Sequence, residues 1–292
     1  MKVLSLFDGI SCGMLALERA GISVERYVAY EIEPNAIAVS KDNYPQIEQC
    51  GDVTTADFTQ YKGFDLVIGG SPCQGFSFAG KQLNFDDERS KLFFEFVRAL
   101  EEVKPKYFLL ENVFMKKEYE DVITRYLGVE PRKIESSLVS GGMRKRIYWT
   151  NIPWIADIQD RGVKFQDVVD SGIVENEKAY CLTCRRGSAR DYFKKNQTNI
   201  VFEPCKDGEY TVENGKVTIV FKKSPNKSPF TFNVNIPDGK YNIRPINRNE
   251  TERLQTVPDN YTKAVSESTA CILLGNGWTV DVIAHILKGV LK

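Results

Sequence analysis

The stretch KVLSLFDGISCGMLALERA, residues 2–20, decides the fold. It begins with the short apolar run KVLSLF and, after a glycine turn, continues as the helical pattern CGMLALERA. Further apolar runs follow at 26–32, 64–70 and 106–112, and residues 90–103, SKLFFEFVRALEEV, have the apolar spacing of a helix. Strands and helices that alternate in this way predict an α/β fold, a Rossmann-like, doubly wound, mostly parallel sheet with helices on both faces.

A second region begins near residue 157, where the pattern changes. Residues 208–224 and 230–243 are rich in β-forming side chains and contain the turn signals Asn-Gly and Asp-Gly. Helical patterns return after this region, and their amphipathic character predicts that they pack back on the first sheet. We therefore expect a larger domain, 1–156 plus 244–292, that carries a smaller β and loop domain, 157–243, as an insertion.

Composition limits the class of protein. The chain has 292 residues, 42% of them hydrophobic, which is ample for a sizeable core. Lys plus Arg and Asp plus Glu are 39 each, so a charged partner has to be met by a local patch. No targeting segment or run of about 20 apolar residues stands out, and the seven cysteines lack the spacing of a disulfide framework. The expectation is a soluble protein of a reducing compartment, away from membranes.

The turn after the first run, LFDGISCG (6–13), lies where a Rossmann-like fold brings a nucleotide close to the backbone. It is not the dinucleotide motif GxGxxG. Glu31 ends the second strand, where a carboxylate can bind both ribose hydroxyls, and Ile32 offers an apolar face to adenine. Asp52 follows in the third unit and can accept from the adenine amino group. These sites fit an adenosine ligand without a phosphate, such as S-adenosyl-L-methionine, although a turn without ligand remains the alternative.

Cys73 is the second notable feature, because it follows Pro72 in the loop GGSPCQGFSFAG (69–80) at the predicted end of a strand. Ligands bind at that edge of an open α/β sheet. A metal is not expected, since no cysteine or histidine stands at ligand spacing and the single histidine, His285, lies in an apolar helical pattern. An unremarkable loop thiol remains an alternative to a nucleophile.

Glu111 ends the next strand, in FLLENV (108–113), so its carboxyl group is expected in the same crevice as Cys73. A thiol and a carboxylic acid together suit methylation of a pyrimidine at C5. Addition of a thiolate at C6 turns the ring into an enamine, and a proton or hydrogen bond at N3 stabilises the charge that this addition creates. Alone, Glu111 would be interpreted as a capping or surface carboxylate.

The chain resembles the cytosine-C5-specific DNA methyltransferase family over essentially its whole length. The blocks occur in the family's order: FDGISCG, EIE, GDV, GGSPCQGFS, ENV, GGMRKRIYW, RPINRNETERLQTVPDNY and GNGWTV. The first turn and the run VSGGMRKRIYWTNIP are most similar to the vertebrate de novo methyltransferase branch, here as a stand-alone catalytic domain. The resemblance implies the fold of S-adenosylmethionine-dependent methyltransferases and a DNA (cytosine-5-)-methyltransferase activity.

The resemblance also implies roles for individual residues. Cys73 would be the nucleophile, Glu111 the partner of N3, Arg146 a donor near the cytosine O2, and Arg144 a neighbour that steadies the catalytic loop. The implied methyl-donor pocket comprises Phe7, Asp8, Gly9, Ile10, Ser11, Cys12, Glu31, Ile32, Asp52, Val53, Thr54, Pro72, Leu92, Asn276, Gly277 and Trp278. The spent donor would leave as S-adenosyl-L-homocysteine.

The implied partner is double-stranded DNA, from which the target cytosine has to be extruded. Residues 157–243 would recognise the target, with Arg185, Arg186 and Arg190 reading guanines or holding phosphates unless this basic loop is simply solvated. We expect a monomer in the cytoplasm of a bacterial or phage-infected cell, compatible with a partner restriction endonuclease. Two alternatives stay open, a transfer RNA substrate and a catalytically inactive DNA-binding homologue.

Overall fold

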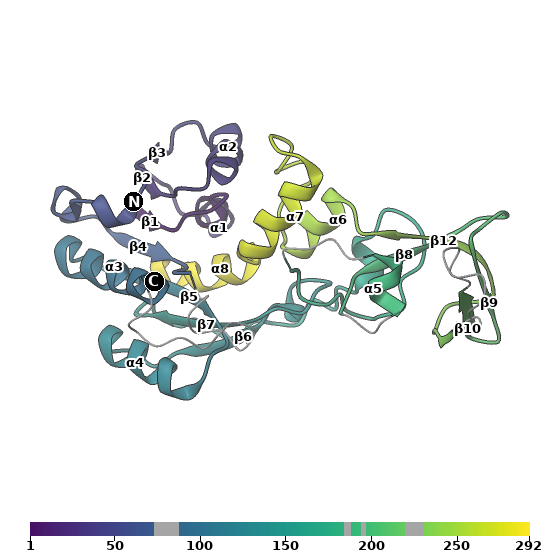
Figure 1. The fold of residues 1–292 in the computed structure, drawn as a ribbon. Helices are drawn as coiled ribbons and strands as arrows, with labels where there is room; N and C mark the ends of the chain where they lie inside the picture. Colours follow the sequence, from purple (N-terminus) through teal and green to yellow (C-terminus); the bar gives the residue numbers. More distant parts are fainter. Residues whose placement is uncertain (73–87, 184–187, 194–196, 220–229) are drawn as a thin grey trace.

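Two sheets lie at opposite ends of an elongated molecule (Figure 1). The computed structural model describes residues 1–72, 88–183, 188–193, 197–219 and 230–292. Seven strands form the larger sheet in the order β3-β2-β1-β4-β5-β7-β6. They are β1 (Lys2–Leu6), β2 (Arg26–Tyr30), β3 (Glu48–Gln49), β4 (Leu66–Gly69), β5 (Tyr107–Val113), β6 (Arg132–Glu135) and β7 (Lys145–Thr150). The first five run parallel, and β7 is antiparallel to both of its neighbours.

Both faces of this sheet are covered, because alternate residues of each strand point to opposite sides. Val3 packs in one core, whereas Leu4 and Leu6 pack in the other. The first core contains residues of α1 (Cys12–Arg19), α2 (Pro34–Asn43), α7 (Glu267–Asn276) and α8 (Val280–Leu287). The second contains residues of α3 (Glu88–Val103), α4 (Lys117–Leu127), η1 (Val53–Thr55) and η2 (Phe58–Tyr61). The predicted doubly wound, mostly parallel architecture is confirmed.

The C-terminal helices correct one expectation from the sequence. Residues Glu267–Leu291, which comprise α7, α8 and η5 (Lys288–Leu291), are long and apolar enough to cross a membrane by length and composition, and the most apolar 18 residues have a mean hydropathy of 1.5. Their apolarity has another physical reason, since 67% of the segment's apolar window is buried inside the protein and α8 packs beside α1 on the sheet. We interpret the segment as core helices.

The smaller sheet is antiparallel, with the order β11-β10-β9-β12-β8. Its strands are β8 (Ile200–Pro204), β9 (Tyr210–Glu213), β10 (Lys216–Ile219), β11 (Phe230–Asn233) and β12 (Gly239–Pro245). Asn214 and Gly215 both have positive φ, as a two-residue hairpin turn between β9 and β10 requires. Asp238-Gly239 does not close a hairpin, because β12 pairs with β8 and β9 rather than with β11. β12 also continues two residues past residue 243, the predicted end of the inserted region.

Aromatic side chains fill the core of the smaller sheet. Phe202 packs edge-on against Tyr241, with ring centroids 5.9 Å apart, and Phe193 from the helix α5 (Ala189–Phe193) lies 5.1 Å from Phe232. The sequence did not predict α5, which lies inside the basic loop. Between the two sheets lie the short helices η3 (Ser136–Leu138), η4 (Phe165–Val168) and α6 (Arg248–Leu254).

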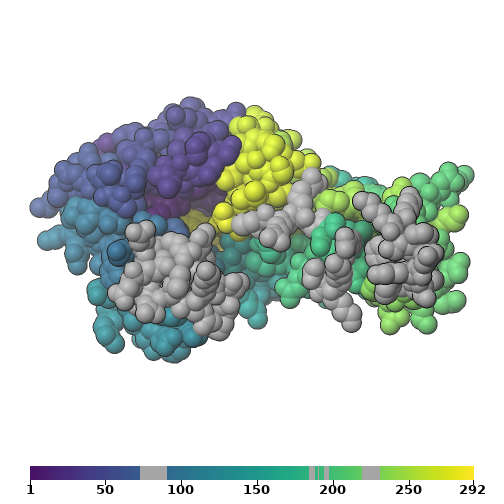
Figure 2. Space-filling view, viewed as in Figure 1, coloured from purple at the N-terminus to yellow at the C-terminus, as the bar shows by residue number. Residues whose placement is uncertain are grey.

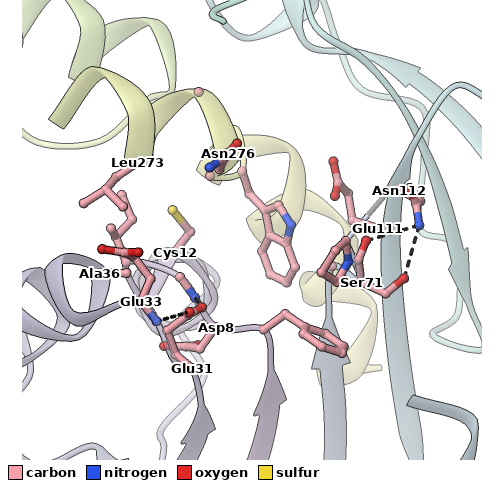
Figure 3. A pocket seen from close by; sticks show the side chains of 18 of the residues that line it. Asp8, Cys12, Glu31, Glu33, Ala36, Ser71, Glu111, Asn112, Leu273 and Asn276 are labelled. Carbon is pink, nitrogen blue, oxygen red and sulfur yellow. Dashed lines mark hydrogen bonds between the residues drawn. The ribbon is translucent and has the colours of Figure 1, made fainter. Parts of the chain in front are cut away.

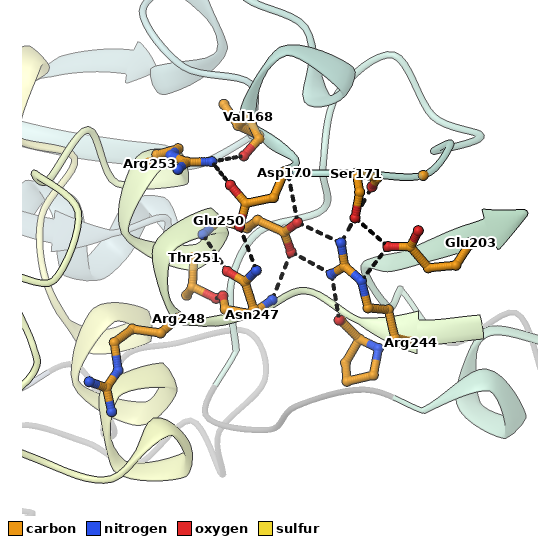
Figure 4. A network of polar contacts seen from close by, with 12 residues as sticks. Val168, Asp170, Ser171, Glu203, Arg244, Asn247, Arg248, Glu250, Thr251 and Arg253 are labelled. Carbon is orange, nitrogen blue, oxygen red and sulfur yellow. Dashed lines mark hydrogen bonds and ion pairs between the residues drawn. The ribbon is translucent and has the colours of Figure 1, made fainter. Parts of the chain in front are cut away.

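A network of charged side chains joins the smaller sheet to α6 (Figure 4). Arg244 of β12 donates to both carboxylate oxygens of Glu250, at 2.7 and 2.8 Å, and to Glu203 of β8 at 2.7 Å. Glu250 is fully buried and also accepts from the backbone N–H of Asp170. Arg253 holds the Asp170 carboxylate from the next turn of α6. The network therefore fixes where the chain enters and leaves the smaller sheet.

Acid is expected to weaken this junction through Asp170. Hydrogen bonds from Asn247 and Arg253 lower the pKa of the Asp170 carboxyl below its ordinary value. Because the folded pKa is lowered, the stabilisation is present above the unfolded pKa and is lost as the pH falls below about 4. Thermal unfolding should therefore show wild type above Asp170→Asn in Tm at pH 7, with the difference shrinking toward pH 3. A difference that does not depend on pH would contradict this role.

Candidate active site

A pocket of 340 Å³ opens at the carboxyl ends of β1, β2, β4 and β5, the edge at which open α/β sheets bind ligands. In the space-filling view, a hollow lies where the purple N-terminal segments and the yellow C-terminal helices meet (Figure 2). Glu111 and Asn112 lie on one side of the pocket, and Cys12 and Glu31 lie on the other (Figure 3). The full lining is Phe7, Asp8, Gly9, Ile10, Cys12, Glu31, Glu33, Ala36, Gly70, Ser71, Pro72, Glu111, Asn112, Val113, Arg144, Arg146, Leu273, Gly275, Asn276, Gly277 and Trp278.

The turn between β1 and α1 is built around a buried carboxylate. Phe7, Gly9 and Ser11 all have φ near +60°, so the backbone coils tightly here. Asp8 accepts hydrogen bonds from the hydroxyl groups of Ser5, Ser11 and Tyr27, at 2.6, 2.5 and 2.7 Å. Burial raises the pKa of the Asp8 carboxyl, and the three hydroxyl donors oppose this effect. The turn is thus fixed by side chains that lie behind it.

Glu31 joins this turn to the end of β2. One carboxylate oxygen accepts from the backbone N–H of Gly9 at 2.8 Å, and the other accepts from Ile32 and Glu33, each at 2.8 Å. The carboxylate lines the pocket, as the predicted ribose site requires. Ile32, just after the end of β2, does not line the pocket and is 70% exposed.

Several residues of the predicted donor pocket lie outside its lining. Asp52 caps η1 by accepting from the backbone N–H and the hydroxyl of Thr54. Val53 and Leu92, a residue of α3, pack in the second core, and Ser11 is buried under the first turn. Adenine binding by Asp52 therefore stays a prediction.

An ion pair joins two of the four predicted catalytic side chains, Glu111 and Arg146, on the far side of the pocket. Glu111 of β5 is opposite Tyr148 in the antiparallel register, and Val113 is opposite Arg146 of β7. Arg146 is thereby a diagonal neighbour of Glu111 on the same face of the sheet. Arg146 Nε lies 2.9 Å from Glu111 Oε1, and the side chains are 13% and 9% exposed. Pairing of β5 with β7 therefore brings together residues that are 35 positions apart.

Arg144 makes contacts that the sequence did not predict. Its guanidinium donates to the backbone oxygens of Gly275 and Gly277, at 3.0 and 2.7 Å, at the C-terminal end of α7. Burial, together with the nearby positive charge of Arg146, lowers the pKa of Arg144. The expected role of Arg144 in steadying the catalytic loop stays a prediction, because that loop includes residues 73–87, which lie outside the described residues.

Cys73 also lies outside the described residues, as do Arg185 and Arg186, and for Arg190 of α5 the side chain is not described. The residues before Cys73 are in place. Pro72 lines the pocket, and Asn112 Nδ2 donates to the Ser71 hydroxyl at 3.2 Å and to the Ser71 backbone oxygen at 3.4 Å. The end of β4 is therefore bound to the end of β5, next to Glu111.

Further lining residues carried no prediction of their own. They are Glu33, Ala36, Gly70, Ser71, Asn112, Val113, Leu273 and Gly275. Six of them lie inside blocks that the sequence analysis quoted, and Ala36 and Leu273 lie within a few residues of one, so membership of these blocks was the available signal. Among the described residues, no three His, Cys, Asp or Glu side chains form a group that could hold a metal.

Known proteins resemble this chain in sequence and in fold. The family model "C-5 cytosine-specific DNA methylase" matches residues 1–123 and 158–292. The type II methyltransferase M.NgoBV of Neisseria gonorrhoeae is 42% identical over 117 residues, which are 39% of this chain and 28% of that protein. Type II methyltransferase M1.ScrFI of Lactococcus lactis subsp. cremoris is 29% identical over the whole chain and 78% of its own length.

A solved structure shares the fold over the full length. The Entamoeba histolytica methyltransferase EhMeth superposes with a TM-score of 0.72 at 17% identity, covering 100% of this chain and 99% of that one. Identity this low supports the fold alone. The family model, in contrast, covers most of the chain, including the turn after β1, the ends of β4 and β5, and the C-terminal helices. The chain therefore belongs to the C-5 cytosine-specific DNA methylase family.

Proposed function

We propose that the protein is a DNA (cytosine-5-)-methyltransferase, which moves the methyl group of S-adenosyl-L-methionine to C5 of a cytosine extruded from duplex DNA. One observation carries the proposal. The Glu111–Arg146 ion pair lies at one side of a pocket whose other side is the acidic end of β2, and Pro72, the residue before Cys73, lines the same pocket.

The residues of the pocket fit this methyl donor. Its volume of 340 Å³ is in the range of small-molecule sites. Glu31 can accept from ribose hydroxyls, and the aromatic rings of Phe7 and Trp278 suit a cationic sulfonium. When bound, the donor supplies an electrophilic methyl group. Phe7, Glu31 and Trp278 would hold it, with Gly9, Asn276 and Gly277 offering backbone contacts.

The chain's own residues would activate the cytosine. The Cys73 thiolate adds to C6, which breaks the C5–C6 double bond, while Glu111 gives a proton or hydrogen bond to N3. Arg146 keeps the Glu111 carboxyl oriented and can donate toward O2. C5 is then nucleophilic enough to take the methyl group. Loss of the C5 proton to a base and departure of the thiolate restore the aromatic ring and the enzyme.

The smaller sheet supports a separate task for residues 157–243, the recognition of the DNA target. A base inside a duplex cannot reach the pocket, so the cytosine has to leave the stack. In the proposal Arg185, Arg186 and Arg190 contact guanine edges or phosphates. The type II names of the relatives support a place in a restriction-modification system, in the cytoplasm of a bacterial or phage-infected cell.

Transfer of a radiolabelled methyl group from S-adenosylmethionine tests the proposal directly. Duplex DNA is expected to become labelled, and bisulfite sequencing should place the label at C5 of cytosine within a short recognition sequence. Labelling of transfer RNA but not of DNA would show that the substrate is transfer RNA and would contradict the proposed DNA substrate. Binding of DNA with no transfer to either nucleic acid would instead indicate an inactive homologue.

Gly70→Ala is expected to weaken donor binding and methyl transfer together. A Cβ at residue 70 would lie 3.0 Å from Trp278 Nε1 and 3.3 Å from Glu111 Oε2, between the donor side and the acid. At these distances the indole or the carboxylate has to move by a few tenths of an ångström. Because Trp278 lines the donor pocket, the affinity for S-adenosylhomocysteine should fall severalfold, and turnover should fall as well.

Gly142→Ala is the matched control for this variant. Its Cβ would also approach a side-chain atom closely, at 3.3 Å from Leu254 Cδ2, but Gly142 does not line the pocket. The control should keep both donor binding and turnover. Wild-type donor affinity and turnover in Gly70→Ala would contradict the assignment of Gly70 to the passage between donor and base.

A further inference from the structure

Gln255 is buried at the end of α6 and forms hydrogen bonds with groups on both sides of Trp278. Only 2% of the Gln255 surface is exposed to solvent. Gln255 Nε2 donates to the Leu274 oxygen at 2.6 Å and to the Gly277 oxygen at 3.3 Å. Gln255 Oε1 accepts from the Thr279 hydroxyl at 2.8 Å, and the Gln255 backbone oxygen accepts from the N–H of Val280 at 3.0 Å. One residue thus connects the end of α7 with the start of α8.

These contacts solve a problem that every helix end has. The last four carbonyl groups of a helix have no partner within the helix and need donors from elsewhere. At the end of α7, Gly277 N–H caps Leu273, Gln255 serves Leu274, and Arg144 serves Gly275. Arg144 and Gln255 also share the oxygen of Gly277. Two side chains from separate elements therefore fix this helix end, although neither belongs to α7.

What they fix is a wall of the pocket. Gly275, Asn276, Gly277 and Trp278 all line it, whereas Gln255 does not. The anchored groups lie immediately before and after Trp278, so a change at Gln255 reaches the pocket through the position of this indole. These groups are buried, so a carbonyl that loses its hydrogen-bond donor cannot reach water unless the backbone moves. Loss of the Gln255 amide should therefore shift the chain next to Trp278.

We propose that Gln255 is a positioning residue for the methyl donor, which sets the location of Trp278 and hence the shape of the donor side of the pocket. The inference rests on the proposed function only in taking the ligand to be S-adenosylmethionine. Arg144, which directly precedes β7, completes the same anchor two residues before Arg146. The donor wall and the residue that pairs with Glu111 are thereby held by one short segment, residues 144–146.

The test compares Gln255→Met with Asn199→Leu. Methionine has nearly the shape of glutamine but cannot donate to the carbonyls. Asn199 is a buried amide of the same kind, bonded to both the N–H and the oxygen of Tyr180, and it does not line the pocket. The probe is S-adenosylhomocysteine without DNA, titrated by calorimetry and by tryptophan fluorescence. Of the three tryptophans, Trp278 lines the pocket and Trp149 and Trp154 do not, so the ligand-dependent signal reports on Trp278.

Gln255→Met is expected to weaken the probe about tenfold or more and to reduce the fluorescence change, the size that loss of donors to buried carbonyls implies. Asn199→Leu should lower Tm, but its affinity for S-adenosylhomocysteine should stay within about twofold of wild type. If Gln255→Met lowers Tm and leaves affinity and fluorescence unchanged, the residue has a structural role and the proposal is overturned.

Thr279 provides the second pair of variants if Gln255→Met fails to fold. Thr279→Ser keeps the hydroxyl that donates to Gln255 Oε1, and Thr279→Val removes it. The valine variant should weaken the probe severalfold, and the serine variant should restore affinity to within about twofold. Equal affinities in both variants overturn the proposal. Failure of wild type itself to bind S-adenosylhomocysteine would instead contradict the proposed function, which separates the two failures.

Discussion

Cys73→Ser is expected to abolish methyl transfer to DNA, with a loss of turnover of at least about 10³-fold. The proposed reaction needs an anionic sulfur that adds to C6 of cytosine. A cysteine thiol has an ordinary pKa near 8.5, and positively charged neighbours lower this pKa. A serine hydroxyl, in contrast, is hardly ionised near neutral pH. Serine has an oxygen atom in place of the sulfur and fills nearly the same space. The variant should therefore keep its fold and its donor pocket.

The measurement has a binding arm and a covalent arm. Affinity for S-adenosylhomocysteine and Tm should match wild type in Cys73→Ser, because the residues that line the donor side are unchanged. Duplex DNA with 5-fluorocytosine at the target should trap wild type in an adduct that survives denaturant, since fluorine cannot leave C5 as a proton does. Near wild-type turnover of the serine variant, or the absence of any adduct, would contradict covalent catalysis.

The structure supports this expectation through the residues that precede Cys73. Asn112 holds Ser71 by two hydrogen bonds, and Pro72 lines the pocket beside Glu111. Pro72 itself lies at the edge of the pocket, and Cys73 lies outside the described residues. Proximity of Cys73 to Glu111 stays a prediction from the sequence, which rests on both segments ending at the same edge of a parallel sheet.

Local patterns explain which parts of the fold were predictable. The runs that became β1, β2, β4 and β5 are short and apolar, and each side of the sheet draws on alternate residues of them. Asn214-Gly215 formed its expected turn because both residues tolerate positive φ. These features depend on neighbours in sequence, which a single chain displays.

Contacts between distant segments were not predictable in the same way. β7 lies between β5 and β6 in the sheet, which makes Glu111 and Arg146 diagonal neighbours. No spacing in the sequence predicts this strand pairing. The partners of Arg144 at Gly275 and Gly277 lie more than 130 positions away. Gln255 lies in the block RPINRNETERLQTVPDNY, but its role was not predictable because its amide acts on backbone groups, which have no sequence pattern of their own. The resemblance supplied Arg144 and Arg146 as candidates, and the structure shows that Arg144 contacts the end of α7 whereas Arg146 pairs with Glu111.

Glu111→Gln is expected to slow methyl transfer by about 10²- to 10⁴-fold, the usual contribution of a general acid. The amide keeps the size of the side chain and can donate a hydrogen bond to N3, but it cannot give a proton. The change also removes the partner of Arg146, 2.9 Å away in a site where both side chains are largely buried. An uncompensated buried charge is destabilising, so a lower Tm is expected as well.

Arg146→Met and the double variant separate the two effects of Glu111→Gln. If Glu111 acted only by pairing with Arg146, then each single variant would lose as much turnover as the double variant, and the coupling in a double-mutant cycle would equal the whole effect. In the proposed mechanism the pair orients the acid, yet the proton at N3 comes from Glu111 alone. Glu111→Gln should therefore remain slower than Arg146→Met when both are compared at saturating donor and DNA. Donor affinity should be unchanged in all three, because Glu31 lies on the opposite side of the pocket (Figure 3). Equal turnover in the two single variants would remove the acid role and leave Glu111 as a partner that holds Arg146 in place.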